Sequence, residues 1–178
     1  MSSPPAAMQA NKRPANQIFH HDEFLFRRVP TWIWDDPAEE LGLEAIELPD
    51  ISVARSKFGH AEWARFDVIN FCHYEDWAVV GVIVERVPPA IWREGFPRFV
   101  FEPRHVPLDR DYSHSEIQAF DESGGHVKVI DSLPDDIHLE WRYKLLREIE
   151  TIIKPFQRVL VRETPPTTHK LEPHTVIA

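Results

Sequence analysis

The sequence is poor in cysteine and glycine: it has one Cys and six Gly in 178 residues. Cys72 alone cannot form an internal disulfide or a thiolate-rich zinc cluster, so neither framework is expected. The few glycines form no Walker or Rossmann pattern, which argues against a glycine-rich phosphate loop. No stretch approaches the roughly 20 apolar residues of a membrane helix. We therefore expect a protein of the reducing cytoplasm with no membrane span.

Basic charge is also scarce, because 20 Lys and Arg stand against 29 Asp and Glu, giving a formal net charge of −9. An acidic chain has no broad attraction for a nucleic-acid backbone or an anionic membrane, so a nucleic-acid partner is not expected. The first residues contain no apolar core of the kind that a secretory signal needs. This again favours a cytoplasmic location.

Apolar residues are plentiful, at 43% of the chain, with 11% aromatic residues. That composition is enough to build a hydrophobic core, so a folded domain is expected. Residues 1–17 and 163–178 are rich in Pro, Ala, Ser or Thr and show little periodicity. We predict a flexible N-terminal arm over 1–17, a single domain over 18–162 and a flexible Pro/Thr-rich tail over 163–178.

Alternating or β-branched stretches predict strands over 23–29, 50–56, 77–87, 98–106 and 112–120. The stretch 77–87 is almost continuously apolar, which is typical of a central strand covered on both faces. A strand over 98–106 contains Pro103, which favours an edge or a bulge. Runs of strands followed by a helix indicate an α+β fold with a mostly antiparallel sheet of five to seven strands.

A hairpin and a helix complete the expected domain. Gly124 and Gly125 lie where a turn would reverse the chain into a strand over 126–130. A long helix from about 134 to 154 follows, with acidic residues in its first turn and one apolar stripe. We expect this C-terminal helix to pack on one face of the sheet. Residues 59–66 are predicted to form a short helix, and 156–161 one more edge strand.

The stretch 109–120, DRDYSHSEIQAF, concentrates polar side chains in a predicted strand. Strand alternation puts His114 and Glu116 on one face with Tyr112, opposite a face of small and apolar residues. In a cleft, His114 and Glu116 would supply a general base and an electrostatic partner, with Tyr112 as an apolar wall. The alternative is a solvated outer face. The spacing matches no zinc motif and no EF-hand, so no metal is predicted.

Two arginine-bearing stretches form the second constellation. Arg28 follows Arg27 in the strand over 23–29, and Arg55 and Ser56 end the strand over 50–56. Such arginines usually lay the stem on apolar surface and keep the head in water. The alternative is that Arg28 clamps a phosphate or carboxylate in a cleft, with Arg55 and Ser56 on its other wall.

Arg28 on an early strand, Ser52 or Ser56 on the next, and Glu116 on a later strand follow one another in that order. This order resembles the Arg–Ser–Glu set of ADP-ribosyltransferase-like toxins. The resemblance covers three short stretches of the chain. It implies that these residues bind NAD and activate its ribose.

Tryptophans in Pro-flanked loops, Trp34 and Trp92, suggest a surface for a protein partner, although local packing is the alternative.

Two classes of function follow from these candidate sites. The first is a soluble, acidic, cytoplasmic protein that acts through protein–protein interaction or regulation. The alternative is a small toxin-like enzyme, an ADP-ribosyltransferase or another transferase or hydrolase, and only this alternative uses NAD. Its cleft would be formed by Arg28, Ser56, His114 and Glu116.

Overall fold

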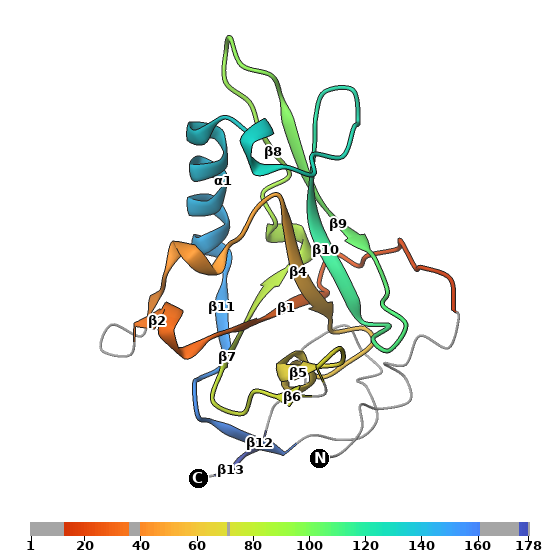
Figure 1. The fold of residues 1–178 in the computed structure, drawn as a ribbon, viewed down its shortest axis with the longest axis vertical. Coiled ribbons are helices and arrows are strands. Elements are labelled where there is room, and N and C mark those ends of the chain that lie inside the picture. Colours follow the sequence, from red (N-terminus) through yellow and green to blue (C-terminus); the bar gives the residue numbers. More distant parts are fainter. Residues whose placement is uncertain (1–12, 36–39, 71, 161–174, 178) are drawn as a thin grey trace.

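A computed structural model describes residues 13–35, 40–70, 72–160 and 175–177, and the rest of the predicted arm and tail lies outside these ranges. The described chain folds around a seven-stranded antiparallel sheet with the order β11-β7-β1-β4-β10-β9-β8 (Figure 1). This agrees with the predicted α+β class and antiparallel sheet. The strands are β1 (Phe24–Val29), β4 (Asp50–Arg55), β7 (Ala78–Ile83), β8 (Ala90–Ile91), β9 (Phe99–His105), β10 (His114–Phe120) and β11 (Glu150–Ile153).

Smaller elements surround the sheet. Three two-stranded sheets pair β2 (Trp34–Asp35) with β3 (Glu40–Leu41), β5 (Phe66–Asp67) with β6 (Cys72–His73), and β12 (Arg158–Leu160) with β13 (Thr175–Ile177). The helix expected over 59–66 is a 3-10 helix, η4 (Ala61–Arg65). Its last residue, Arg65, is buried and donates to the carbonyl oxygens of Trp77, Lys154 and Gln157. Tertiary contacts therefore fix this segment. Among the described residues, no helix is long and apolar enough to cross a lipid bilayer.

β7 is an internal strand whose side chains are covered on both faces, as its β-branched sequence predicts. It pairs with all six residues of β1 on one side and with β11 on the other. Gly81 allows close packing here, because a Cβ at that position would lie 3.1 Å from both Phe24 and Ile152.

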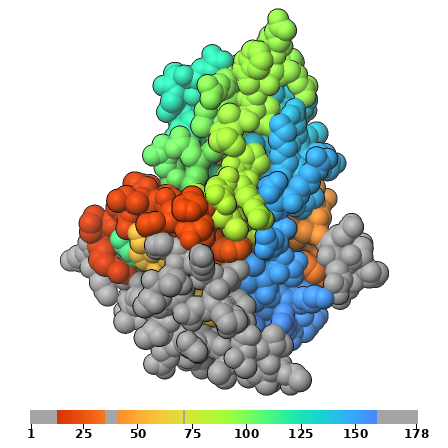
Figure 2. Space-filling model, turned by 180° about the vertical axis from the view of Figure 1, so that it is seen from behind, coloured from red at the N-terminus to blue at the C-terminus, as the bar shows by residue number. Residues whose placement is uncertain are grey.

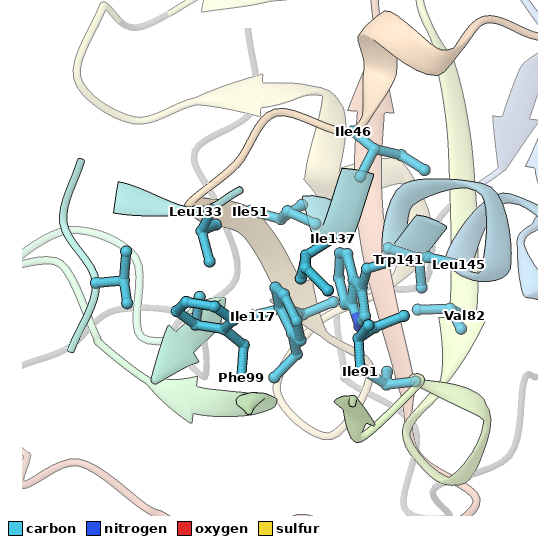
Figure 3. Packing of buried hydrophobic residues seen from close by; sticks show 14 of the residues in the cluster. Ile46, Ile51, Val82, Ile91, Phe99, Ile117, Leu133, Ile137, Trp141 and Leu145 are labelled. Atoms are coloured by element: carbon cyan, nitrogen blue, oxygen red, sulfur yellow. The ribbon is translucent and has the colours of Figure 1, made fainter. Parts of the chain in front are cut away.

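The one α-helix in the described ranges, α1 (Asp135–Glu148), contributes three buried side chains to the main core. Ile137, Trp141 and Leu145 belong to one cluster with side chains of β4, β7, β9 and β10 (Figure 3). The Trp141 ring stacks on Phe101 with centroids 4.2 Å apart, and its Nε1 donates to the Pro88 carbonyl oxygen at 2.7 Å. This indole thus combines a large apolar contact with a satisfied polar atom.

The predicted strand over 77–87 ends at Ile83, and the edge strand expected over 156–161 is β12, which pairs with β13 outside the main sheet. Two further predicted elements also differ from the structure. The helix expected to reach residue 154 ends at Glu148, and the β-branched run after it returns to the sheet as β11, where such residues are favoured. The strand expected over 126–130 is reduced to one bridge between His126 and Phe120. The reason is that β10 is already flanked by β4 and β9, so only its last residues have a free edge.

The two faces of the sheet differ in character. The inner face carries Leu25, Ile51 and Ile117 and holds the main core. The outer face carries Phe26, Ser52 and His114, which alternate with the inner residues in register. Part of the inner face is covered by the N-terminal segment, residues 13–20, whose red atoms form a band across the back of the molecule (Figure 2).

Candidate functional site

The sheet opens between β1 and β4. In the described strands these two neighbours pair only at Leu25↔Arg55 and Phe26↔Ala54, and then they diverge (Figure 1). Continuing the register would place Arg28 opposite Ser52. The Ser56 N–H donates to the Phe24 carbonyl oxygen at 2.9 Å, so the peptide groups of these residues face each other. Because orientation alternates along antiparallel strands, the peptide groups of Arg28 and Ser52 also face the opening.

A cleft of about 420 Å³ occupies this opening. Its volume lies within the roughly 300–1,000 Å³ of small-molecule sites. Aromatic and apolar walls come from η4 and its surroundings, namely Trp63, Phe66, Ile69 and Trp77. Polar groups converge from other elements: Arg28, Ser52, Asp67, Asp111 and His114. An apolar cleft with a few convergent polar groups is the usual form of a ligand site.

Arg28 is half-buried and held in place from one side. One of its guanidinium nitrogens lies 3.0 Å from an Asp67 carboxylate oxygen, and the guanidinium lies over the rings of Tyr74 and Trp77 at 5.2 and 5.9 Å. Burial acts to raise the pKa of Asp67, but hydrogen bonds from Asn70 and the nearby charge of Arg28 outweigh it and leave that pKa lowered. Asp67 is therefore a carboxylate that orients Arg28.

Arg27 points to the inner face and closes the opening from that side. Its guanidinium donates to the Ser52 carbonyl oxygen at 3.1 Å and to Glu47 at 3.3 Å. Burial lowers the pKa of Arg27, against the opposing effect of Glu47. The side chain bridges the two strands where their ladder is interrupted.

Ser52 and His114 form a hydrogen-bonded pair in the cleft, with Oγ and Nε2 3.0 Å apart. The His114 Nδ1 lies 2.7 Å from the carbonyl oxygen of Val106, which can only accept. Nδ1 therefore carries the hydrogen, Nε2 presents its lone pair, and the Ser52 hydroxyl donates to it. This assignment follows from the partners of each ring nitrogen.

Glu116, the third residue of the Arg–Ser–Glu set, pairs directly with Ser52 across β10 and β4, on the same face. Its carboxylate accepts a hydrogen bond from Gln118 at 2.7 Å. It does not line the cleft as His114 does. Arg28, Ser52 and Glu116 nevertheless lie on the outer face of three neighbouring strands, and Ser52 and Glu116 are directly paired.

Ser56, the other serine considered, is buried, and its Oγ accepts from the Phe24 N–H at 3.0 Å. Ser52 is thus the serine that lines the cleft together with Arg28. The sequence order of residues left both serines open, and only the register of β1 and β4 separates them.

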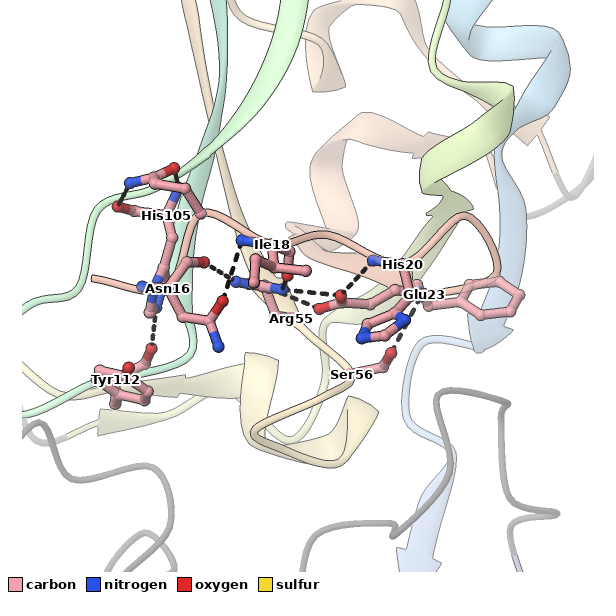
Figure 4. A network of polar contacts seen from close by, with 10 residues as sticks. Asn16, Ile18, His20, Glu23, Arg55, Ser56, His105 and Tyr112 are labelled. Carbon is pink, nitrogen blue, oxygen red and sulfur yellow. Dashed lines mark hydrogen bonds and ion pairs between the residues drawn. The ribbon is translucent and has the colours of Figure 1, made fainter. Parts of the chain in front are cut away.

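Arg55 and Tyr112 belong to a different, buried network on the inner face (Figure 4). Two Arg55 nitrogens bind the Glu23 carboxylate at 2.6 and 2.8 Å, and the guanidinium also donates to the carbonyl oxygens of Asn16 and Ile18. The Tyr112 hydroxyl donates to the Pro14 carbonyl oxygen at 2.8 Å. These contacts tie the N-terminal segment to the sheet and leave Arg55 outside the cleft.

The tryptophans separate into buried and exposed sets. Trp34 is buried against Val29 and Ala78, whereas Trp92 is 68% exposed. Sequence analysis did not select Trp32, which is 75% exposed and packs edge-on against Trp77 at 5.4 Å, or the exposed Ile69. Trp32 stands beside Trp34 in the same TWIWDD stretch, and nothing in that stretch distinguished the exposed ring from the buried one.

Asp67, Trp63 and Asp111 are further cleft residues that sequence analysis did not assign to a site. Within the described ranges, no group of three or more His, Cys, Asp or Glu is placed to hold a metal ion.

In comparisons with family models, curated proteins and solved structures, nothing matches this chain.

Proposed function

We propose that this chain is an ADP-ribosyltransferase that uses NAD as its substrate in the cleft between β1 and β4. The supporting observation is that Arg28, Ser52 and Glu116 share the outer face of three neighbouring strands and that Arg28 and Ser52 line the cleft. These residues are far apart in the sequence and converge only through the order of the strands. They are also the residues that carry the resemblance to the Arg–Ser–Glu enzymes.

Arg28 is suited to bind the pyrophosphate of NAD. A guanidinium offers a planar fork that matches phosphate oxygens. Its ion pair with Asp67 and the rings of Tyr74 and Trp77 hold the side chain at the cleft. Arg28 therefore needs little further ordering when a phosphate arrives, which favours binding.

The aromatic walls are suited to the flat rings of NAD. Trp63, Phe66 and Trp77 line the cleft, and stacking on an aromatic face contributes about 1–3 kcal/mol per base in nucleic-acid complexes. Stacking does not depend on the net charge of the protein. The acidic character of the whole chain therefore does not prevent this kind of recognition.

Glu116 is suited to stabilise positive charge on the ribose. When the bond between the ribose C1′ and the nicotinamide nitrogen breaks, nicotinamide leaves with the electron pair and charge develops on the sugar. The Glu116 carboxylate is next to the cleft, because its residue pairs with Ser52 on the same face, and it offers the compensating negative charge there. The acceptor then bonds to C1′ and releases one proton, so the products are the ADP-ribosylated acceptor, nicotinamide and a proton.

The proposal predicts that Glu116→Gln lowers nicotinamide release from NAD by about 10²–10³-fold, the cost typical of removing one electrostatic stabiliser. The assay incubates the purified chain with NAD labelled in the nicotinamide ring and measures free nicotinamide. Glu102→Gln is the matched control, because Glu102 pairs with Gln118 on the same face but forms a surface ion pair with Arg104. Equal activity of Glu116→Gln and wild type, or no turnover by wild type, would contradict the proposal.

A protein-binding role is supported by a separate observation, the exposed Trp32 and Ile69 around the cleft. Large exposed apolar side chains next to a concave site are typical anchors for a partner. We propose that this rim contacts a protein partner, and an acceptor protein of the transfer reaction fits the position.

For this rim, Trp32→Ser is expected to weaken binding by about 2 kcal/mol, roughly 30-fold in Kd. The measurement uses peptides selected from a random library on the wild-type chain, with Kd determined by fluorescence anisotropy. Trp92→Ser is the control, since Trp92 is almost equally exposed, whereas Trp32 packs against Trp77, a residue that lines the cleft. If the Kd of the selected peptides rises in Trp92→Ser but not in Trp32→Ser, the partner surface lies elsewhere.

A further inference from the structure

We infer that His114 is the general base of the reaction and that the acceptor is a hydroxyl group; this inference rests on the proposed NAD chemistry. The observation behind it is the fixed state of the imidazole. Nδ1 donates to the Val106 carbonyl oxygen at 2.7 Å, so Nε2 carries a lone pair, which accepts from the Ser52 Oγ at 3.0 Å. A base held in one tautomer by a backbone carbonyl is ready to take a proton at its other nitrogen.

The position of this lone pair also fits the role. His114 lines the same cleft as Arg28 and Ser52, and it stands two residues before Glu116 on the same face of β10. In the pairing of β10 with β4, Glu116 lies opposite Ser52 and His114 lies opposite Ala54. The proposed base is therefore two residues along β10 from the proposed charge-stabilising carboxylate. An acceptor that enters the cleft toward the ribose therefore meets Nε2.

The transfer step balances with these groups. The acceptor oxygen forms a bond to C1′ of the ribose, while the bond from C1′ to the nicotinamide nitrogen breaks and its electron pair leaves with nicotinamide. The hydroxyl proton passes to Nε2, either directly or through the Ser52 hydroxyl, and His114 becomes an imidazolium. Water then takes this proton, which regenerates the neutral base.

The chemistry of the cleft favours a hydroxyl acceptor over a guanidinium. The Ser52 hydroxyl shows that a hydroxyl forms a hydrogen bond to Nε2 with good geometry. A guanidinium acceptor is cationic and would need a free carboxylate, but each carboxylate that lines the cleft has a partner. Asp67 binds Arg28, Glu47 binds Arg27, and Asp111 accepts from Ser113. The Arg28 guanidinium in the same cleft would also repel it.

The decisive experiment separates proton transfer from NAD binding. In His114→Gln, transfer of ADP-ribose to a serine-containing peptide should fall by at least about 10²-fold, the lower end for loss of a general base. The Kd for NAD, measured by calorimetry, should change by less than about 3-fold, because the variant keeps the fold and Arg28. Added imidazole should restore transfer in His114→Gly, which a purely structural role of His114 would not allow.

Three outcomes overturn the inference while leaving the proposed function standing: unchanged transfer in His114→Gln, no rescue by imidazole, or transfer to agmatine, a guanidinium probe, in preference to the serine peptide. If the wild-type chain neither binds NAD nor releases nicotinamide, the proposed function itself fails. Circular dichroism of both variants checks that they fold. The two failures are therefore distinguishable in one set of measurements.

Discussion

At the residue scale, two arginines on opposite faces of the sheet lie in different surroundings. Arg28 lies in the cleft, whereas Arg55 is fully buried and bound to Glu23 and to two backbone carbonyls. In the sequence both are arginines within short strands, so local pattern treats them alike. What separates them is the N-terminal segment, which covers Arg55 from about 37 residues away in the chain. That contact is non-local and leaves no sign in the sequence around Arg55.

The buried pair leads to a prediction about stability. Arg55→Met should lower the free energy of unfolding by about 3–5 kcal/mol, because it leaves the Glu23 carboxylate buried without its partner. Chemical denaturation followed by tryptophan fluorescence measures the change. Adding Glu23→Gln should recover part of the loss. The control Arg93→Met, which removes half-exposed ion pairs with Asp136 and Glu140, should cost less than about 1 kcal/mol. Equal losses in both variants would show that burial does not govern the effect.

At the element scale, periodicity predicted the strands well and the ends of elements less well. Alternation in residues 114–120 gave the correct outward set, because a one-residue shift would expose Ile117 and Ala119. The apolar spacing of Ile149 and Ile152 fits a helix as well as a strand, so sequence alone continued the helix through β11. The pairing of β11 with β7 decides between them, and this pairing is a tertiary contact.

The attachment of the N-terminal segment predicts a pH dependence. The buried His105 accepts from the Asn16 N–H at Nδ1 and donates to the Tyr112 carbonyl oxygen at Nε2, both at 2.6 Å. Burial lowers the pKa of His105, although the hydrogen bond to Tyr112 opposes this, while Arg55 lowers it and Glu23 raises it. The unfolded chain therefore binds the proton more readily than the folded one.

The free energy of unfolding should accordingly keep its full value above about pH 6.5, the usual pKa of histidine, and fall as the pH drops below it. Urea denaturation at pH 7.5 and pH 5.5 gives the difference in free energy of unfolding. In His105→Gln this difference should become smaller, because the titrating group is gone. A difference that is unchanged in the variant would assign the pH dependence to other groups.

At the scale of the whole molecule, the cleft exists because the sheet is paired unevenly. β1 pairs with β7 along all six of its residues but with β4 at only two positions in the described strands. Local pattern was enough to predict the α+β class and to place Arg28, His114 and Glu116 on strands. It did not predict the opening or the choice of Ser52 over Ser56, because both depend on where two strands separate.

The central claim, that NAD binds between β1 and β4, is tested most directly by following the tryptophan indole N–H signals in a nuclear magnetic resonance titration with NAD. Trp63 and Trp77 line the cleft, and their signals should shift in a saturable way. Trp92 is on the surface outside the cleft and Trp141 is in the core, so their signals should stay in place. Unmoved signals of Trp63 and Trp77 at saturating NAD, or a shift confined to Trp92, would contradict the account.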